Sequence, residues 1–225
     1  MMNEPTYDWP GWPLKENPFG KEFDIHARER MIAGSKELLP FIKKYRTEIG
    51  KTILEVGPFF NPLITPEGFP EKGTHIFYWE NDRHVLEWIA KKYPQASPIY
   101  CDLNSIAGDS FLVLKKRTQE LLQKIAGKEK FDAVIVSHVF NYIEYKLFLI
   151  ILKDFIKKDG IVMTNNVVDY GLPAYFSRTR PKSIPETIAS VQEAGYHILE
   201  KKILPPKNPT AQKHDRLIII AQNGN

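Results

Sequence analysis

Short apolar runs alternate with amphipathic segments through most of the chain. Five of these runs predict buried strands: TILEV (52–56), HIFYW (75–79), SPIYC (97–101), FDAVIVS (131–137) and GIVMTNN (160–166). Helical patterns separate most of them, over residues 83–93, 110–127 and 144–160, and Gly160 supplies a helix-ending signal for the last. Apolar strands that alternate with helices predict a parallel sheet covered on both faces.

The two ends of the chain break this alternation. Residues 1–20 hold four prolines, which argue against regular structure, together with Tyr7, Trp9, Trp12 and Phe19. Residues 21–47 have the composition of a helix, whose buried face would carry Phe23, Ile25, Met31, Leu38, Leu39 and Ile42. Near the other end, strand patterns over 196–204 and 214–222 flank the turn PPKNP and predict a hairpin.

These elements predict an α/β protein with two parts. Residues 50–225 would form a doubly wound, mostly parallel seven-stranded sheet with an antiparallel C-terminal strand and helices on both faces. Residues 1–49 would form an extended arm and a helix that act as a lid. A chain of 225 residues is long enough for one sizeable core and short for two.

Composition narrows the class of protein without identifying it. Hydrophobic residues make up 43% and charged residues 26%, and a net charge of +4 demands neither a nucleic acid nor a membrane surface. Cys101 is the one cysteine, so no internal disulfide can form and a reducing cytoplasm fits best. The N-terminal residues lack the apolar core of a signal peptide, and no apolar run reaches the ~20 residues of a membrane helix. The six histidines are scattered, which predicts no metal site. The sequence leaves the oligomeric state open, with a homodimer as one alternative.

The stretch TILEVGPFFNPLI (52–64) carries the first chemical signal. Glu55 lies near the end of a buried strand, and Gly57 opens a turn where ligands bind in open parallel sheets. The G-x-G-x-x-G of dinucleotide sites is absent. The hhE-h-G run followed by Pro58 instead resembles the first motif of class I S-adenosylmethionine-dependent methyltransferases.

Further motifs extend this resemblance over about residues 50–222. Glu80 closes the second strand in IFYWEND, and Asp102 closes the third in IYCDLN. The fourth strand runs into SHVFNYI (137–143), which is similar to the family's SHVLEHI-type segment, and KKDG (157–160) resembles its LKPGG turn. The terminal hairpin matches the antiparallel strand with which the family ends its sheet.

The resemblance implies S-adenosylmethionine as cofactor and S-adenosylhomocysteine as product. The backbone at Gly57 and Pro58 would pass the methionine part, with Glu55 orienting that loop or the ammonium group. Glu80 would accept from the ribose hydroxyls beside Asn81. Four further residues would contact the cofactor. Asp102 would accept a hydrogen bond from the adenine amino group and Leu103 would pack beside the adenine ring, while Ser137 and His138 would lie near the transferable methyl group.

Several positions depart from the family or allow a structural reading. Phe59 and Asn61 stand where the family often has glycines, so a bulky side chain could wall off the amino-acid end of the cofactor or pack inward and hold the loop. Glu55 could cap a neighbouring helix, and Asp82 rivals Glu80. Asp102 could be a helix N-cap, and Asn141-Tyr142 replaces the family's frequent Glu-His.

The acceptor side is expected in residues 167–186, where the family often inserts acceptor-binding elements. Tyr170, Tyr175, Phe176, Arg178 and Arg180 would suit a planar or carboxylate-bearing acceptor, unless the segment is a solvated loop. Trp12 of the arm could close the same mouth, or serve a packing strap or a dimer contact. His138 is the first candidate for a general base, before Tyr142 and Tyr170, although it could be a structural histidine.

These features favour a metal-independent methyltransferase that modifies oxygen or nitrogen of a small molecule. An Asn/Asp-Pro-Pro-Tyr/Phe motif after the fourth strand and a concentrated basic stripe are both absent, which disfavours nucleic acid as substrate. A non-catalytic binding or scaffold protein with the same sheet stays open because the glycine turn is degraded. A nicotinamide-dependent oxidoreductase is the weaker alternative, since it needs the richer glycine turn.

Overall fold

The computed structural model describes residues 37–100, 130–141, 143–169, 180–205 and 215–224, together with positions 34, 116, 119, 120 and 123. The described residues form seven strands: β1 (Thr52–Val56), β2 (His75–Glu80), β3 (Ser97–Tyr100), β4 (Phe131–Ser137), β5 (Ile156–Val167), β6 (Tyr196–Leu204) and β7 (Arg216–Asn223). The helices with described ends are α2 (Arg83–Lys92), α4 (Tyr145–Leu152) and α5 (Ile184–Glu193), and a short 3-10 turn, η2 (Lys153–Phe155), follows α4.

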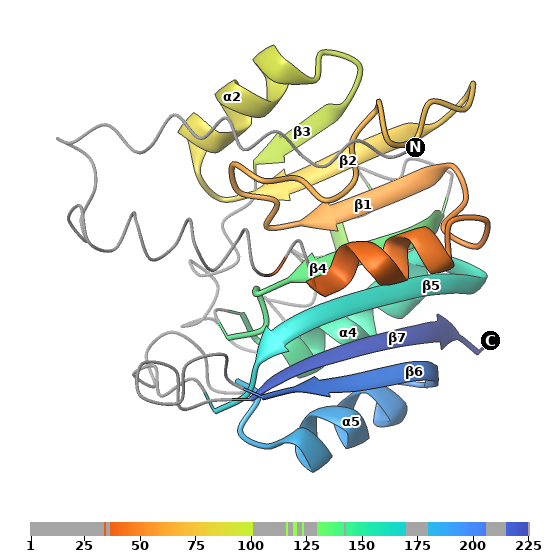
Figure 1. Cartoon of the computed structure of the whole chain (residues 1–225), viewed down its shortest axis with the longest axis vertical. Coiled ribbons are helices and arrows are strands. Elements are labelled where there is room, and N and C mark those ends of the chain that lie inside the picture. The colour runs from red at the N-terminus through yellow and green to blue at the C-terminus, as the bar shows by residue number, and fades with distance from the viewer. Residues whose placement is uncertain are drawn as a thin grey trace, which may run out of the picture.

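All seven strands belong to one sheet in the order β3-β2-β1-β4-β5-β7-β6 (Figure 1). β1 to β5 pair in parallel, whereas β7 pairs antiparallel with both β5 and β6. The predicted mostly parallel seven-stranded sheet with an antiparallel C-terminal strand is therefore confirmed. The carboxyl ends of β1, β2, β4 and β5 meet at one edge of this sheet.

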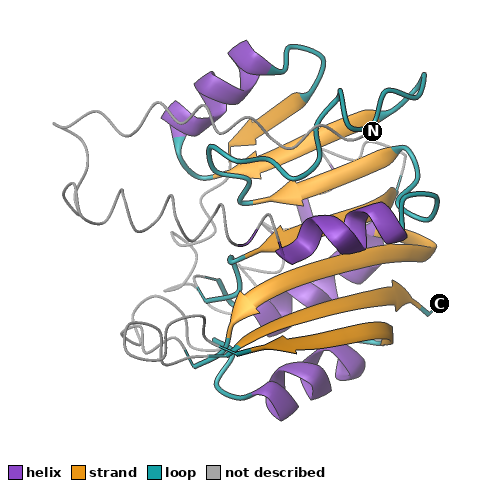
Figure 2. Ribbon diagram, viewed as in Figure 1, coloured by secondary structure: helices purple, strands orange, loops and turns teal. Residues whose placement is uncertain are grey.

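Helices cover both faces of the sheet, as predicted (Figure 2). On one face, Leu38 and Ile42 of the helix that holds residues 37–44, here called the N-terminal helix, share a core with Val85 and Ile89 of α2. On the other face, α4 and α5 pack on a second core whose sheet side includes Leu54, Val134 and Leu217. The inner strands β1, β4 and β7 bury both faces, which is why their sequences are mostly apolar rather than alternating.

The predicted helix over 144–160 is wrong at its end. α4 stops at Leu152, and β5 already begins at Ile156. Ile156 pairs with Phe131 and Ile161 pairs with Ala133, so Lys157–Gly160 form a bulge inside the strand. Asp159 takes a positive φ of 64° there. A basic run that ends in a residue of left-handed conformation is also the pattern of a helix C-terminus, so Gly160 misled the sequence prediction.

Helix α5 was not predicted. Its N-cap is Ser183, whose Oγ accepts a hydrogen bond from the backbone N–H of Glu186 at 3.2 Å, with a proline in the first turn. The S-x-x-E spacing of Ser183 and Glu186 is a helix-start signal in the sequence. This signal lies at the end of the segment 167–186, whose aromatic and arginine residues predict acceptor contacts rather than a helix.

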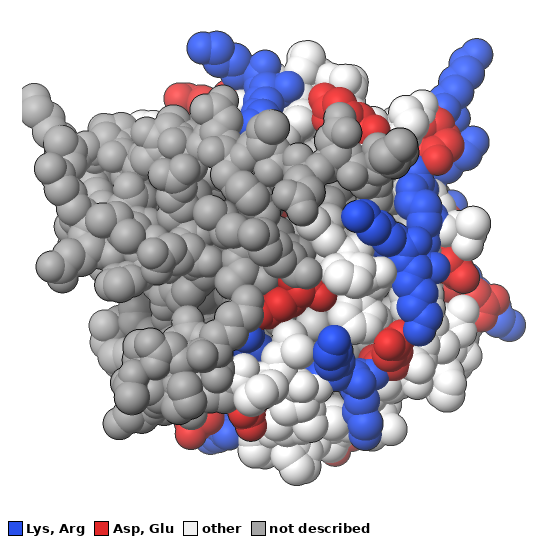
Figure 3. All heavy atoms as spheres, viewed as in Figure 1, with Lys and Arg blue, Asp and Glu red and all other residues white. Residues whose placement is uncertain are grey.

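Membrane spans and metal clusters are both absent from the part of the chain that the structure describes. No helix there is long and apolar enough to cross a membrane. No group of three His, Cys, Asp or Glu side chains among the described residues is placed to hold a metal ion. On the face shown in Figure 3, the Lys and Arg side chains lie interspersed with Asp and Glu side chains.

Candidate functional site

Glu55 fixes the loop that follows the Gly57 turn. Its side chain is buried in the last but one position of β1, and only 1% of the residue is exposed. Oε1 and Oε2 accept hydrogen bonds from the backbone N–H of Leu63 at 2.8 and 3.1 Å, and Oε2 also accepts from Ile64 at 3.0 Å. The carboxylate therefore folds residues 57–64 back over the end of β1, which is the loop-orienting role expected for it. Its contact with a cofactor stays a prediction.

Glu80 joins the tips of β1 and β2. It ends β2 with 6% of its surface exposed, and its Oε2 accepts a hydrogen bond from the backbone N–H of Phe59 at 3.0 Å. Its Oε1 accepts from Asn81 at 2.8 Å and from Asp82 at 3.3 Å. The backbone N–H of Gly57 donates to the carbonyl oxygen of Trp79 at 2.8 Å, so the glycine turn and the Glu80 carboxylate are neighbours.

Asp82, the rival to Glu80, has a different task. Its Oδ1 accepts hydrogen bonds from the backbone N–H groups of His84 at 2.8 Å and Val85 at 3.4 Å. These contacts make it the N-cap of α2. Glu80 is thus the carboxylate that contacts the glycine turn. The preference for Glu80 over Asp82 as the group that binds the ribose hydroxyls stays a prediction. Asn81 beside it is exposed, and Pro58 in the turn is buried.

Burial gives both strand-end carboxylates unusual proton affinities. It raises the pKa of Glu55 to about 8, although the hydrogen bonds from Leu63 and Ile64 act in the opposite direction. Burial likewise raises the pKa of Glu80 to about 7, against three backbone hydrogen bonds that lower it. Both groups therefore change protonation state near neutral pH. A ligand that donates hydrogen bonds to Glu80 would favour its ionised form.

Phe59 has a left-handed backbone conformation, which glycine adopts more readily than other residues. Its φ is 52° and that of Gly57 is 66°, so the turn holds two left-handed residues. Such a φ costs a non-glycine residue about 1–2 kcal/mol. The Phe59 ring packs edge-to-face on Phe60 with centroids 5.0 Å apart, and Phe60 packs in the same way on Trp88 of α2 at 5.6 Å. Of the two expectations for this position, inward packing that holds the loop is the one found.

The segment after β4 lies against the N-terminal helix and the glycine turn. His138 has a positive φ of 59°, and its backbone N–H donates to the carbonyl oxygen of Asn165 at 2.6 Å. A Cβ added to Gly34 would lie 2.5 Å from His138 Nε2, and one added to Gly57 would lie 2.4 Å from Val139 Cγ2. Glycines at 34 and 57 therefore allow three segments to meet at the end of β4. Ser137, the last residue of β4, is half-buried.

A buried polar cluster, which the sequence did not predict, lies beside His138. Glu37 of the N-terminal helix forms an ion pair with Arg216 of β7, with Oε1 and Nη2 2.8 Å apart, and both side chains are over nine-tenths buried. Asn165 of β5 donates from Nδ2 to Glu37 Oε2 at 3.4 Å. Asn165 Oδ1 and Arg216 Nε are enclosed and have no hydrogen-bond partner among the described residues. Leaving such a buried group unpaired costs about 1–3 kcal/mol.

Signals for this cluster exist in the sequence, but they are weak. Asn165 lies near the end of an apolar strand, and Arg216 precedes the apolar run LIIIA. Neither position reveals its partner, because the cluster joins residues from the N-terminal helix, β5 and β7. The adjacent Asn166 Oδ1 accepts from the backbone N–H of Phe140 at 3.0 Å, and Asn141 Nδ2 donates to the carbonyl oxygen of Val167 at 2.9 Å.

The remaining predicted site residues are only partly placed. Arg180 is half-buried, and its Nη1 is enclosed without a hydrogen-bond partner among the described residues. Eight predicted positions lie outside the described residues: Trp12, Asp102, Leu103, Tyr142, Tyr170, Tyr175, Phe176 and Arg178. Their roles stay predictions.

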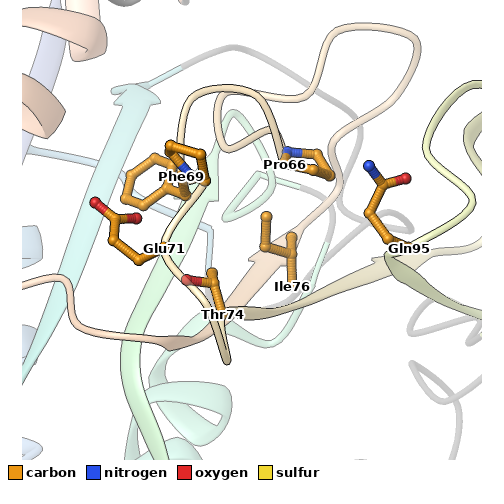
Figure 4. A pocket seen from close by; sticks show the side chains of 7 residues that line it. Pro66, Phe69, Glu71, Thr74, Ile76 and Gln95 are labelled. Atoms are coloured by element: carbon orange, nitrogen blue, oxygen red, sulfur yellow. The ribbon is translucent and has the colours of Figure 1, made fainter.

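A hollow of about 310 Å³ lies away from this edge (Figure 4). It is lined by Pro66, Phe69, Pro70, Glu71, Thr74, Ile76 and Gln95, next to the start of β2. Glu71 is engaged by Arg46, whose guanidinium also stacks 3.7 Å from the centroid of the Phe69 ring. None of the predicted site residues lines this hollow.

Comparisons with known proteins bear on the fold. Neither a protein-family model nor a curated protein sequence matches the chain. An S-adenosylmethionine-dependent methyltransferase from Clostridium acetobutylicum has a similar structure, with 11% identity, a TM-score of 0.60, and coverage of 91% of this chain and 99% of its own. The Burkholderia thailandensis 1,6-didemethyltoxoflavin-N1-methyltransferase, solved with 1,6-didemethyltoxoflavin and S-adenosylhomocysteine, also has 11% identity and a TM-score of 0.60, over 91% and 83%.

The same fold also occurs in a structure described by another activity. The [4+2]-cyclase SpnF is 13% identical to the chain, with a TM-score of 0.55 over 83% of this chain and 80% of its own. Identities this low show the fold alone. The chain therefore has the fold of S-adenosylmethionine-dependent methyltransferases, as the sequence resemblance predicted.

Proposed function

We propose that the protein is an S-adenosylmethionine-dependent methyltransferase that modifies an oxygen or nitrogen of a small molecule and releases S-adenosylhomocysteine. The observation that carries this proposal is the buried Glu80 carboxylate, which lies against the Gly57 turn at the tip of β2. The sheet has the strand order 3-2-1-4-5-7-6 with an antiparallel β7. A dinucleotide oxidoreductase of the usual doubly wound kind has the order 3-2-1-4-5-6, so this alternative loses support.

The described residues fit such a cofactor. The turn itself requires glycine at position 57, because φ is positive and a Cβ there would lie 2.4 Å from Val139 Cγ2. Glu80 would accept hydrogen bonds from the two ribose hydroxyls. A carboxylate has about four acceptor sites and the backbone donors use three, so one hydroxyl would take the remaining site and the other would replace the 3.3 Å contact from Asp82. Glu55 would hold the loop between these groups. Pro58, Asn81, Ser137 and, outside the described residues, Asp102 and Leu103 are the other proposed contacts.

The cofactor supplies an activated methyl group on a sulfonium, so the protein has to align the acceptor and exclude water. Positioning of that kind can contribute on the order of 7–11 kcal/mol. We assign His138 the role of general base, since it follows β4 at the carboxyl edge of the sheet, with Tyr142 and Tyr170 as further candidates. A base typically accelerates such a transfer ~10²–10⁴-fold. Trp12, Tyr175, Arg178 and Arg180 are the proposed acceptor contacts, and no metal is required.

A non-catalytic protein that binds the same cofactor is the second candidate. Phe59 favours it, because a phenylalanine occupies a left-handed position of the turn where the resemblance predicts glycine. The two candidates differ in turnover rather than in binding. His138→Ala should lower turnover more than cofactor affinity if the side chain acts as a base.

Calorimetric titration of the full chain tests the proposal. We expect micromolar binding of S-adenosylhomocysteine and no binding of NAD. Glu80→Ala should weaken the binding by about 1–3 kcal/mol because hydrogen bonds to a charged acceptor are lost. Asp82→Asn is the matched control, since asparagine preserves the α2 cap and should leave affinity unchanged. Binding of neither ligand, or equal affinity in Glu80→Ala and the native chain, would contradict the proposed cofactor site.

A further inference from the structure

The cluster of Glu37, Asn165 and Arg216 holds hydrogen-bonding capacity that the described protein does not use. Asn165 Nδ2 donates to Glu37 Oε2, and Arg216 Nη2 lies 2.8 Å from Glu37 Oε1. Asn165 Oδ1 and Arg216 Nε have no partner among the described residues. Asn165 is 0% exposed and Arg216 is 6% exposed, so bulk water does not satisfy these two atoms.

The chemistry of the two unused atoms is fixed by their neighbour. A reversed Asn165 amide would point its oxygen at the Glu37 carboxylate, so the amide oxygen is the acceptor that remains. An arginine does not deprotonate in proteins, so Arg216 Nε is a donor. Glu37 neutralises Arg216, which leaves the cluster with one acceptor, one donor and no net charge.

The position of the cluster connects it with the proposed reaction. Asn165 pairs with Ser137 near the carboxyl end of β4, and its carbonyl oxygen accepts from the backbone N–H of His138. Arg216 opens β7 opposite Val167. The cluster thus lies at the edge where parallel sheets bind ligands, beside the residue assigned as base.

We propose that Asn165 and Arg216 recognise the methyl acceptor, and that the acceptor is a neutral heterocycle with a lactam edge. Its N–H group donates to Asn165 Oδ1, and its carbonyl oxygen accepts from Arg216 Nε. A carboxylate is excluded from this position because one of its oxygens would face Asn165 Oδ1 without a proton between them. The inference rests on the proposed methyltransferase function and narrows its substrate class.

Entry of the acceptor requires a movement of the N-terminal helix. Both recognition atoms are enclosed in this state, and Glu37 of that helix holds both side chains. The helix therefore has to shift from the end of β5 before a heterocycle reaches them.

Ligand-detected NMR on the full chain, saturated with S-adenosylhomocysteine, tests the inference with three probes. 2-Pyridone has the lactam edge, N-methyl-2-pyridone lacks its N–H donor, and benzoate offers acceptors alone. We expect 2-pyridone to bind at least about tenfold more tightly than the other two, because each of these leaves a buried group unpaired. Equal binding of the two pyridones, or no probe binding to a protein that binds S-adenosylhomocysteine, would overturn the inference and leave the proposed function intact.

Arg216→Lys separates the donor from the charge. Lysine keeps a cation for Glu37 but has no Nε–H, so 2-pyridone affinity should fall about tenfold while S-adenosylhomocysteine affinity stays the same. Arg46→Lys, at the distant hollow, is the matched control and should change neither affinity. Asn165→Ser gives the same test if Arg216→Lys does not fold. Unchanged 2-pyridone affinity in a folded variant would show that the cluster holds only enclosed water. Failure of S-adenosylhomocysteine to bind the native chain would instead reject the proposed function.

Discussion

The imidazole of His138 lies directly against the backbone of Gly34. A Cβ at Gly34 would meet Nε2 at 2.5 Å and Cδ2 at 2.9 Å, both closer than real Cβ contacts. Gly34 is the first helical residue that the structure describes. A side chain at this position would displace the imidazole of His138, the candidate base. This contact couples the N-terminal helix to the carboxyl end of β4.

The effect of Gly34→Ala on the free energy of unfolding should have opposite signs in the native chain and in a His138→Ala chain. In the native chain the added methyl group should destabilise the protein by about 1–3 kcal/mol, as overpacking does. In a His138→Ala chain the clash is gone, and alanine should stabilise the helix by about 0.8–1 kcal/mol relative to glycine. Urea unfolding of the four proteins gives the interaction energy. The same effect of Gly34→Ala in both backgrounds would disprove the contact.

The Phe59→Ala variant should be less stable than the Phe59→Gly variant. Both substitutions remove the ring, but alanine keeps the cost of the left-handed conformation, so Phe59→Gly should be about 1 kcal/mol more stable than Phe59→Ala. Phe60 provides the control, because its φ is not positive and glycine there should be the less stable variant. Thermal unfolding of the two pairs measures both differences. The same order at both positions would rule out strain at Phe59.

Glu55 should make the native chain lose stability as pH rises. Burial raises its pKa from the ordinary 4.5 to about 8 in the folded protein, so between these values the folded state binds more protons than the unfolded state. The free energy of unfolding should then fall from about pH 4.5 to about pH 8, by up to about 5 kcal/mol relative to Glu55→Gln. Urea unfolding of both proteins across this range is the measurement. Parallel pH curves would mean that Glu55 titrates normally.

Binding of S-adenosylhomocysteine should weaken below neutral pH. The ribose hydroxyls are expected to bind the ionised form of Glu80, whose pKa is about 7 without ligand. Below that pH a proton must first be lost, so affinity should fall about tenfold per pH unit. Calorimetry between about pH 5.5 and about pH 8.5, a range that brackets this pKa, measures the slope. Glu80→Gln should bind more weakly, with a flat profile. An equally steep slope in Glu80→Gln would assign the titration to another group.

Strand positions could be predicted because β1, β2 and β4 bury both faces and therefore form continuous apolar runs. Glu55 and Glu80 were found for the same reason, since a carboxylate stands out at the end of such a run. Local pattern failed at Lys157–Gly160, where a strand bulge and a helix C-terminus share one sequence signature.

Neither hydrophobic periodicity nor motif spacing could predict the cluster of Glu37, Asn165 and Arg216. Asn165 and Glu37 are separated by 128 positions along the chain, and only the packed sheet brings them together. Likewise, the sequence allowed Phe59 to pack inward or to wall off the ligand, and only its contacts with Phe60 decide between the two.

The place of β7 in the sheet has a consequence for how the chain is made. β7 follows β5 and β6 in sequence, yet it lies between them and is buried along most of its length. While the ribosome is still adding residues 216–223, β5 has an open edge and β6 has no neighbour to pair with. Of the seven described strands, β7 is therefore made last and closes the sheet, and a stall shortly before residue 216 would leave an aggregation-prone edge for a chaperone to cover.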